Sequence, residues 1–263
     1  MSIFLAAICA AIWTTSIMLK FSPLTIISLF PLYTWALVGI SWNSGNITTF
    51  PIGLRDITFP FNIANATHVS GYYYAQQFAF VNALAPSIGY IGIQSRPDRN
   101  GKSIIHAVFS SFIAGTTTTD ANCHLSADVG PGVSCTVDVP SDYSHTYNMV
   151  VENTAGTTWT GIMVDTVTGS KTQVGSWALP SRGIGGIKSS QVGFIEYYPW
   201  NDGMNHSCDT LPKTSVFFGV PTTTAFGAIP TLLNGYEYGN CAGEVNFVSS
   251  RSQAGVLISI GVV

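Results

Sequence analysis

The sequence has few charged residues. Asp, Glu, Lys and Arg together make up only 9% of its 263 residues, and the net charge is −3. The basic residues are scattered, so the concentrated positive patch that proteins use to bind nucleic acid is missing. With so little charge, the surface must be covered largely by Ser, Thr, Asn and Gly, as in many secreted β proteins. We therefore expect partners that are neutral or recognised by shape, and no nucleic acid.

The common motifs of catalysis and metal binding are also missing. The five histidines are widely spread, and no serine or cysteine has a Gly-x-Ser-x-Gly setting, so we do not expect serine-hydrolase chemistry. Neither Cys-x-x-Cys nor His-x-x-x-His spacing occurs, which argues against a cysteine or histidine metal site. The glycine-rich residues 183–187 lack the spacing and the following helix of a phosphate-binding loop. We predict no cofactor.

Strand patterns dominate the chain after its N-terminal apolar region, where no convincing helix is found. The clearest pattern covers residues 146–179, three short strands rich in β-branched and aromatic residues and separated by turns. Such a meander exposes a broad face that needs a partner sheet. We therefore predict an all-β fold, a two-sheet antiparallel sandwich. Further strands are expected at 71–80, 89–94, 103–114, 134–139 and 191–198, with an edge strand at 59–63 limited by Pro60.

Residues 2–40 are almost wholly apolar and favour a leader. Met18-Leu19-Lys20, followed by the apolar residues 21–38 and the small-x-small site Thr34-Trp35-Ala36, is typical of a signal peptide. The true start is then Met18; alternatively, Met1 begins one long leader, or the stretch is a retained membrane anchor. We expect residues 1–36 to be a leader and residues 37–263 to be a single secreted, extracellular domain. Membrane contact is expected only if the leader is not cleaved.

The cysteines agree with export. Cys9 lies in the apolar leader, which leaves four cysteines, an even number suited to two disulfides in an oxidising compartment. Three pairings are possible. We favour Cys123 with Cys135, because the turn between them brings two strand ends together, and Cys208 with Cys241 then follows.

Three sequons are present for N-glycosylation. Asn46, Asn65 and Asn205 each begin an Asn-x-Ser/Thr acceptor site, which is informative only in a eukaryote. If these sites are used, the three segments lie on the surface.

Several blocks resemble the secreted domain-of-unknown-function family 3472. They are Gly89-Tyr90-Ile91-Gly92-Ile93-Gln94, the meander with Tyr147, Thr160-Gly161 and 165–169, and Gly193-Phe194-Ile195-Glu196-Tyr197, in the family's order within about residues 71–220. The family commonly has a tryptophan in the strand after its GIQ block, where this chain has none in residues 104–109. The resemblance implies a jelly-roll-like, concanavalin-like sandwich, often attached in bacteria to carbohydrate-directed modules, and no established catalytic residues.

Glu196 is the candidate catalytic acid. It lies in an apolar-aromatic strand beside Tyr197, where burial would raise its pKa. With a second carboxylate about 5 to 10 Å away it would suit glycoside chemistry, and the acids considered are Asp165, Asp202 and Glu152. The plainer interpretation is a structural acid hydrogen-bonded to a tyrosine or an arginine.

The loop after Glu196 is the candidate ligand-binding segment. Trp200 offers an indole to stack on a sugar, Asn201 and Asp202 can bind hydroxyls, and Tyr198 adds a second ring. Asn201 and Asp202, with Asp209, could instead hold calcium, although the spacing is not that of an EF-hand. The plainer interpretation is a solvated turn held by Cys208.

Three functions remain open from the sequence. The first is a disulfide-bonded sandwich that binds glycan or another extracellular surface without catalysis. The second is a glycoside-active enzyme that uses Glu196 with a second carboxylate. The third is a secreted effector or toxin-like interaction protein, in which the sandwich is a stable scaffold.

Overall fold

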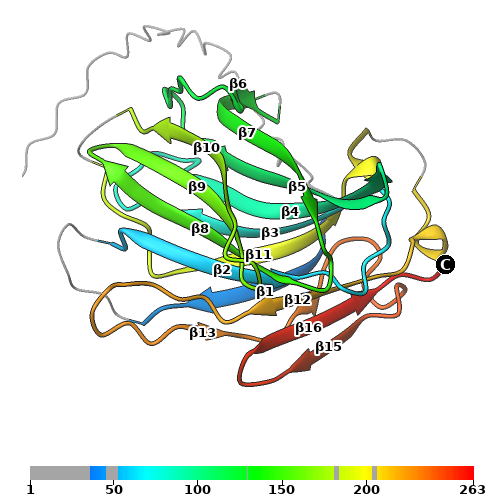
Figure 1. Cartoon of the computed structure of the whole chain (residues 1–263). Coiled ribbons are helices and arrows are strands. Elements are labelled where there is room, and N and C mark those ends of the chain that lie inside the picture. Colours follow the sequence, from blue (N-terminus) through cyan, green and yellow to red (C-terminus); the bar gives the residue numbers. More distant parts are fainter. Residues whose placement is uncertain (1–35, 46–52, 129, 181–183, 203–205) are drawn as a thin grey trace, which may run out of the picture. The chain divides into compact units, whose positions relative to one another are not determined.

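The structure is a computed structural model that describes residues 36–45, 53–128, 130–180, 184–202 and 206–263. The leader expected at residues 1–36 lies outside the described residues except for Ala36, where the first strand begins. Thr34–Val263 form one compact unit. Two antiparallel sheets pack face to face in this unit, which confirms the all-β sandwich (Figure 1).

The first sheet has nine strands and contains the candidate site. Its order is β13 (Thr231–Leu232), β1 (Ala36–Asn43), β11 (Ser190–Tyr197), β3 (Tyr72–Ala79), β4 (Ile88–Arg99), β5 (Lys102–Ser111), β7 (Gly130–Ser141) and β6 (Cys123–Ala127), and β14 (Tyr236–Glu237) also pairs with β1. Because β1 pairs with β11, which lies far along the chain, this sheet depends on long-range contacts.

The second sheet has seven strands and contains the predicted meander. Its order is β10 (Lys171–Ala178), β9 (Thr158–Asp165), β8 (Thr146–Ala155), β2 (Asp56–Asn62), β12 (Thr214–Gly219), β16 (Gly255–Ile260) and β15 (Val248–Arg251). The meander is β8, β9 and β10, as its turns and β-branched residues predict. The only helical turns among the described residues are the 3₁₀ segments η1 (Tyr198–Asp202) and η2 (Cys208–Thr210).

The core lies between the two sheets and follows from alternation along the strands. On β8, Tyr147, Met149 and Val151 are buried while the residues between them are half-buried, as the two-residue period of a strand requires. Rings from the two sheets meet across the interface, and Phe109 stacks on Trp177 with ring centroids 4.7 Å apart. Each large apolar side chain buried in this way contributes about 2 to 3 kcal/mol. Contact between the sheets therefore stabilises the fold.

The prediction that the strand containing Pro60 lies at a sheet edge is wrong. β2 lies inside the second sheet, between β8 and β12, because its alternating Ile57, Phe59 and Phe61 are needed in the core. The missing N–H of Pro60 does no harm, since β12 pairs with β2 only at Phe61 and Asn62. A proline is tolerated where no partner requires its N–H.

Both expected disulfides are present. Cys123 and Cys135 are cross-strand partners in β6 and β7, and Cys208 in η2 is joined to Cys241. The first bond closes a hairpin at the edge of the first sheet. The second joins a 3₁₀ turn to a segment 33 residues further along the chain.

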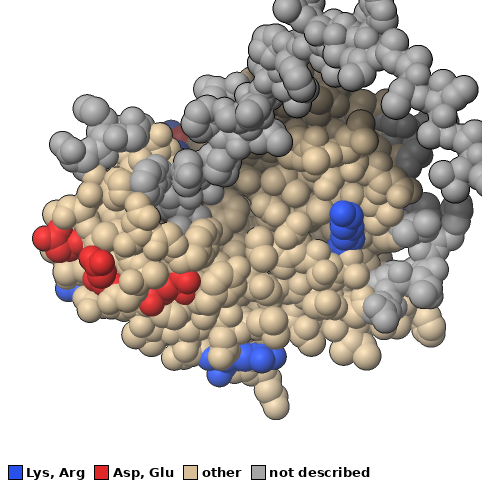
Figure 2. All heavy atoms as spheres, turned by 180° about the vertical axis from the view of Figure 1, so that it is seen from behind, with Lys and Arg blue, Asp and Glu red and all other residues tan. Residues whose placement is uncertain are grey.

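The surface reflects the low charge of the sequence. Figure 2 shows broad areas without charged side chains and only a few separate acidic and basic groups. No helix in the described residues is long and apolar enough to span a membrane.

Candidate functional site

The first sheet has an unusual outer face, by which we mean the face that points away from the second sheet. In a two-layer sandwich this face normally meets water and is polar. Here it has its own buried cluster of Tyr73, Ala75, Val108 and Phe194, with Tyr90 and Tyr198 packed against it. Phe194 meets the ring of Tyr90 at 5.1 Å and that of Tyr73 at 5.7 Å, both nearly edge to face.

A row of polar side chains crosses the same face. Glu196 pairs with Tyr73, Tyr73 with Gln94, Gln94 with His106, and His106 with Asp138, on five neighbouring strands. Directly opposed residues in an antiparallel pair point to the same face, so all five side chains share it. Neighbouring strands are about 4.8 Å apart, so the row spans roughly 19 Å.

Glu196 lies at one end of this row and is only 7% exposed. Its Oε1 accepts a 2.7 Å hydrogen bond from Nδ2 of Asn201, which η1 places beside it. Burial raises the pKa of Glu196, the hydrogen bond from Asn201 lowers it, and the charge of Asp128 raises it further. The net effect is a carboxyl group that holds its proton more tightly than a free glutamate does.

Asp128 is the acid that the sequence analysis missed. It lies in the turn between β6 and β7, and its charge also raises the pKa of Tyr73 and that of Tyr90. In the sequence it belongs to a glycine-proline turn, and nothing in the pattern shows which sheet face the turn approaches. Only knowledge that the β6–β7 hairpin lies at the edge of the first sheet places Asp128 near this face.

Two of the acids considered in the sequence analysis lie in the other sheet. Glu152 is on β8 and Asp165 ends β9, so both belong to the second sheet. Asp165 is hydrogen-bonded to His145, with Oδ2 2.9 Å from Nδ1. Asp202 ends η1, next to Asn201, and Asn201 is the residue of this segment that reaches Glu196.

The structure places Trp200 in the core. Its side chain is 7% exposed and packs against Tyr197 and His206, with ring centroids 5.4 and 5.1 Å apart. Such burial leaves little ring surface for a sugar to stack on, and this differs from the expected exposed platform. The reason is that η1 places the indole against Tyr197 as part of the main core cluster.

Tyr198 is half-buried at the edge of the outer face. Its hydroxyl accepts a 2.9 Å hydrogen bond from the N–H of Gly71 and another from the guanidinium of Arg96, which also lies 5.7 Å from the ring centroid. These contacts fix the ring, because a cation over an aromatic face is attracted to it.

His106 and Asp138 form a hydrogen-bonded pair at the far end of the row. Nδ1 of His106 lies 2.7 Å from Oδ1 of Asp138, and Arg99 donates to the other carboxylate oxygen at 2.6 Å. Burial lowers the pKa of His106 despite the opposing effect of Asp138. The hydrogen bonds from His106 and Arg99 lower the pKa of Asp138.

The remaining predictions concern metals and glycans. Among the described residues no cluster of three acidic, histidine or cysteine side chains could hold a metal ion. Asn65 is exposed in the turn after β2, whereas Asn46 and Asn205 lie outside the described residues.

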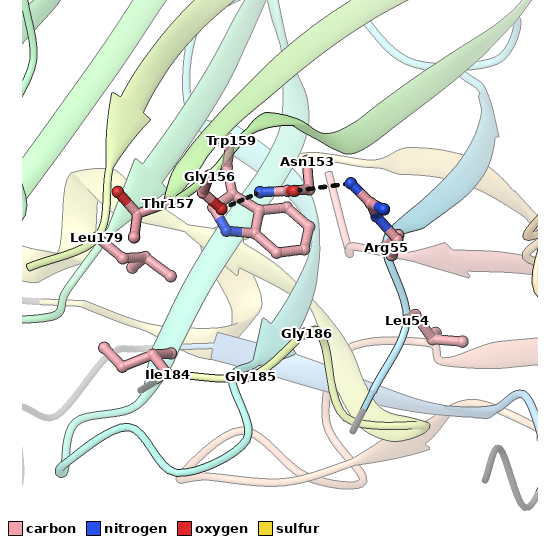
Figure 3. Close-up of a pocket in the computed structure, with 10 residues that line it drawn as sticks. All are labelled: Leu54, Arg55, Asn153, Gly156, Thr157, Trp159, Leu179, Ile184, Gly185 and Gly186. Carbon is pink, nitrogen blue, oxygen red and sulfur yellow. Dashed lines mark hydrogen bonds between the residues drawn. The ribbon is translucent and has the colours of Figure 1, made fainter. Parts of the chain in front are cut away.

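A separate cavity of about 260 Å³ lies at one end of the second sheet (Figure 3). Its wall includes Trp159, Leu179 and Arg55, and Arg55 donates a 3.3 Å hydrogen bond to Asn153. Asn153 in turn donates to the carbonyl of Gly156, so the two side chains that could bind a polar ligand mainly hold the loop together. The cavity includes none of the residues predicted from the sequence to bind a ligand.

Comparison with known proteins identifies similar folds. No known family model and no curated protein matches the chain. Among solved structures, it is similar to scytalido-glutamic peptidase with a peptide-based transition-state analogue (14% identity, TM-score 0.45) and with a transition-state analogue inhibitor (13%, 0.46). It is also similar to SCP-B, a member of the eqolisin family of peptidases, in complex with a tripeptide (13%, 0.45). Each match covers 88% of this chain and 100% of the other. At such identities the likeness concerns the fold alone.

Proposed function

We propose that this protein is secreted and binds an extended extracellular polymer, carbohydrate first, on the outer face of the first sheet, without changing it chemically. The observation that supports this proposal is the aromatic cluster of Tyr73, Tyr90 and Phe194 on the face that the sandwich does not need for its core. Of these rings Tyr90 is half-buried, whereas Tyr73 and Phe194 are only 6% and 7% exposed, so Tyr90 is the ring of the cluster that offers surface to a ligand.

The row beside the cluster suits a ligand with many hydroxyl groups. Glu196, Gln94 and His106 offer hydrogen-bonding groups at intervals of one or two strands, and the half-buried ring of Tyr90 offers apolar surface on the same face. Sugars present the same combination, with apolar C–H faces and hydroxyl edges. A chain laid across the strands would meet a new side chain about every 4.8 Å.

Other features favour an extracellular ligand. Two disulfides are typical of proteins in an oxidising compartment, which agrees with the expected leader. The exposed sequon at Asn65 is compatible with glycosylation of a secreted chain. The resemblance to family 3472 that the sequence blocks suggest stays a prediction, and it would imply the same class of ligand.

A second candidate function is acid-catalysed glycoside hydrolysis. One observation favours it: the charge of Asp128 reaches Glu196 and raises its pKa. In such a site the protonated Glu196 would donate a proton to the leaving oxygen, and Asp128 would act as the second carboxylate. In this candidate function Asp128, and not Asp165, Asp202 or Glu152, is the carboxylate that acts together with Glu196.

A polysaccharide pull-down with the secreted protein tests both functions. The polymers are cellulose, chitin, xylan and β-1,3-glucan, with release of reducing sugar assayed on each one that binds. The variants are Tyr90→Ala and Glu196→Gln, and the matched control is Phe226→Ala, which removes an aromatic ring that is 93% exposed outside this face.

Binding by the wild type without sugar release, weakened about tenfold or more in Tyr90→Ala and retained in Phe226→Ala, supports the binding function. Sugar release that Glu196→Gln abolishes while binding persists supports the enzyme instead. If none of the four polymers is retained, both carbohydrate functions are wrong and the protein-interaction function remains. Thermal unfolding of each variant shows whether the fold is intact.

A further inference from the structure

The phenol oxygen of Tyr73 is buried without a hydrogen-bond partner among the described residues. The side chain is only 6% exposed. Three buried side-chain atoms in the described part of the chain share this condition, and the others are Oε1 of Gln76 and Nε1 of Trp177. By alternation Gln76 faces the core, and Trp177 is part of it, so Tyr73 is the one on the outer face.

The two neighbouring tyrosines show that the fold can satisfy such groups. The hydroxyl of Tyr72 donates to the carbonyl of Pro212, and the hydroxyl of Tyr74 is hydrogen-bonded to Thr214, both at 2.5 Å. A buried polar atom without a partner destabilises a protein by about 1 to 3 kcal/mol, and such atoms are rare in native structures. The stability of the free protein therefore does not explain why the hydroxyl of Tyr73 is buried there.

The surroundings of Tyr73 resemble a binding subsite. It stands between Glu196 and Gln94 in the row, its ring packs against Phe194, and its neighbours include Tyr90. Burial, with the charges of Asp128 and Glu196, keeps the pKa of Tyr73 far above its usual value. The phenol is therefore neutral at every physiological pH and can donate a hydrogen bond.

We infer that Tyr73 is the residue that donates a hydrogen bond to a ligand oxygen on this face, and that the ligand is an uncharged, hydroxyl-rich sugar. This inference rests on the proposed function and names the subsite. The charge of Asp128, which raises the pKa of Tyr73, disfavours anionic groups such as uronates and sulfates at this subsite. Because the phenol oxygen is enclosed in the free protein, the ligand reaches it only after a covering side chain moves.

The test compares Tyr73→Phe with Tyr74→Phe as the matched control. Each change removes one hydroxyl, on opposite faces of the same strand. We expect Tyr73→Phe to leave the unfolding midpoint unchanged or raise it, and to weaken binding about tenfold, because one hydrogen bond to the ligand is lost. Tyr74→Phe should lower the midpoint and leave binding unchanged.

The binding probes are soluble neutral polymers, xylan and a β-1,3-glucan, with polygalacturonate and dextran sulfate as anionic counterparts. If wild type binds a neutral polymer and Tyr73→Phe binds it equally well, the inference is wrong while the proposed function stands. A midpoint that falls in Tyr73→Phe as far as in Tyr74→Phe shows a structural partner for the phenol, which also overturns it. Preference for the anionic polymers contradicts the neutral ligand, and wild type that binds no polymer overturns the proposed function itself.

Discussion

At the scale of single residues, the outer face shifts the pKa of several ionisable groups. Glu196 is shifted toward its neutral form by burial and by Asp128, and His106 is shifted toward its neutral form by burial. Both lie in one row with Tyr73, which is neutral as well. The face therefore shifts Glu196 and His106 toward their uncharged forms, whereas Asp138 at the far end of the row is shifted toward its charged form.

Glu196 should make the folded protein less stable as the pH rises. Its pKa is higher in the folded than in the unfolded chain, so the folded state holds the extra proton and stability falls as the pH passes from the unfolded to the folded pKa. Glu196→Gln removes this dependence, so the variant should gain stability relative to wild type between pH 4 and pH 8. Urea unfolding at both pH values measures the gain.

The exposed Glu244→Gln is the matched control and should show no such gain. A Glu196→Gln variant whose stability relative to wild type is the same at pH 4 and pH 8 would show that the carboxyl group is not shifted in the folded protein.

At the scale of elements, the meander is held at its turn by a polar cluster. Burial alone would raise the pKa of Asp165, but hydrogen bonds from His145 and from the N–H groups of Val167 and Thr168 outweigh it and lower the pKa to about 2. The same carboxylate thus accepts hydrogen bonds from its own turn and from His145, which immediately precedes β8. These bonds fix the turn between β9 and β10.

Asp165→Asn should destabilise the protein by about 1 to 2 kcal/mol near pH 6, because it replaces a charged hydrogen-bond acceptor by a neutral one. The pKa of Asp165 is lower in the folded chain, so its contribution is complete above about pH 4 and is lost as the pH falls toward 2. Denaturant unfolding at pH 6 and pH 2.5 should show a large difference from wild type at the first pH and a small one at the second. An equal difference at both would contradict this role.

The elements also show where sequence patterns succeed and fail. The meander was predictable because its turns, its β-branched residues and its hydrogen bonds are all local. β2 was predicted as an edge strand, because a proline usually excludes a central position. Its actual place follows from β12, which meets it only past Pro60, and no local pattern carries that information.

At the scale of the whole molecule, the two disulfides tie parts of the chain that the sheets already hold close. Cys123–Cys135 closes a separation of 12 residues and Cys208–Cys241 one of 33. In the chain-entropy view, the longer loop restricts the unfolded chain more.

Removing Cys208–Cys241 as a double alanine variant should therefore cost about 4 kcal/mol, and removing Cys123–Cys135 about 3 kcal/mol. Denaturant unfolding of both variants, compared with the wild type in its oxidised and reduced forms, measures the two costs. If the shorter loop proves the more costly to open, the native contacts around Cys123, such as those of Gly175, and not chain entropy, determine the stability.

The sequence by itself determined the class of this protein. Low charge, the even cysteine count and the alternation in 146–179 predicted a disulfide-bonded antiparallel sandwich, because each depends on composition or on neighbours along the chain. It also singled out Glu196 from its apolar-aromatic strand. Only the tertiary structure decided which face of the strand Glu196 occupies, that Trp200 is buried, and that Tyr73 and Asp128 lie near the acid. These features depend on strand order and on the position of the hairpin. Both bring Glu196 near residues that are about 70 (Asp128) and about 120 (Tyr73) positions away in the sequence.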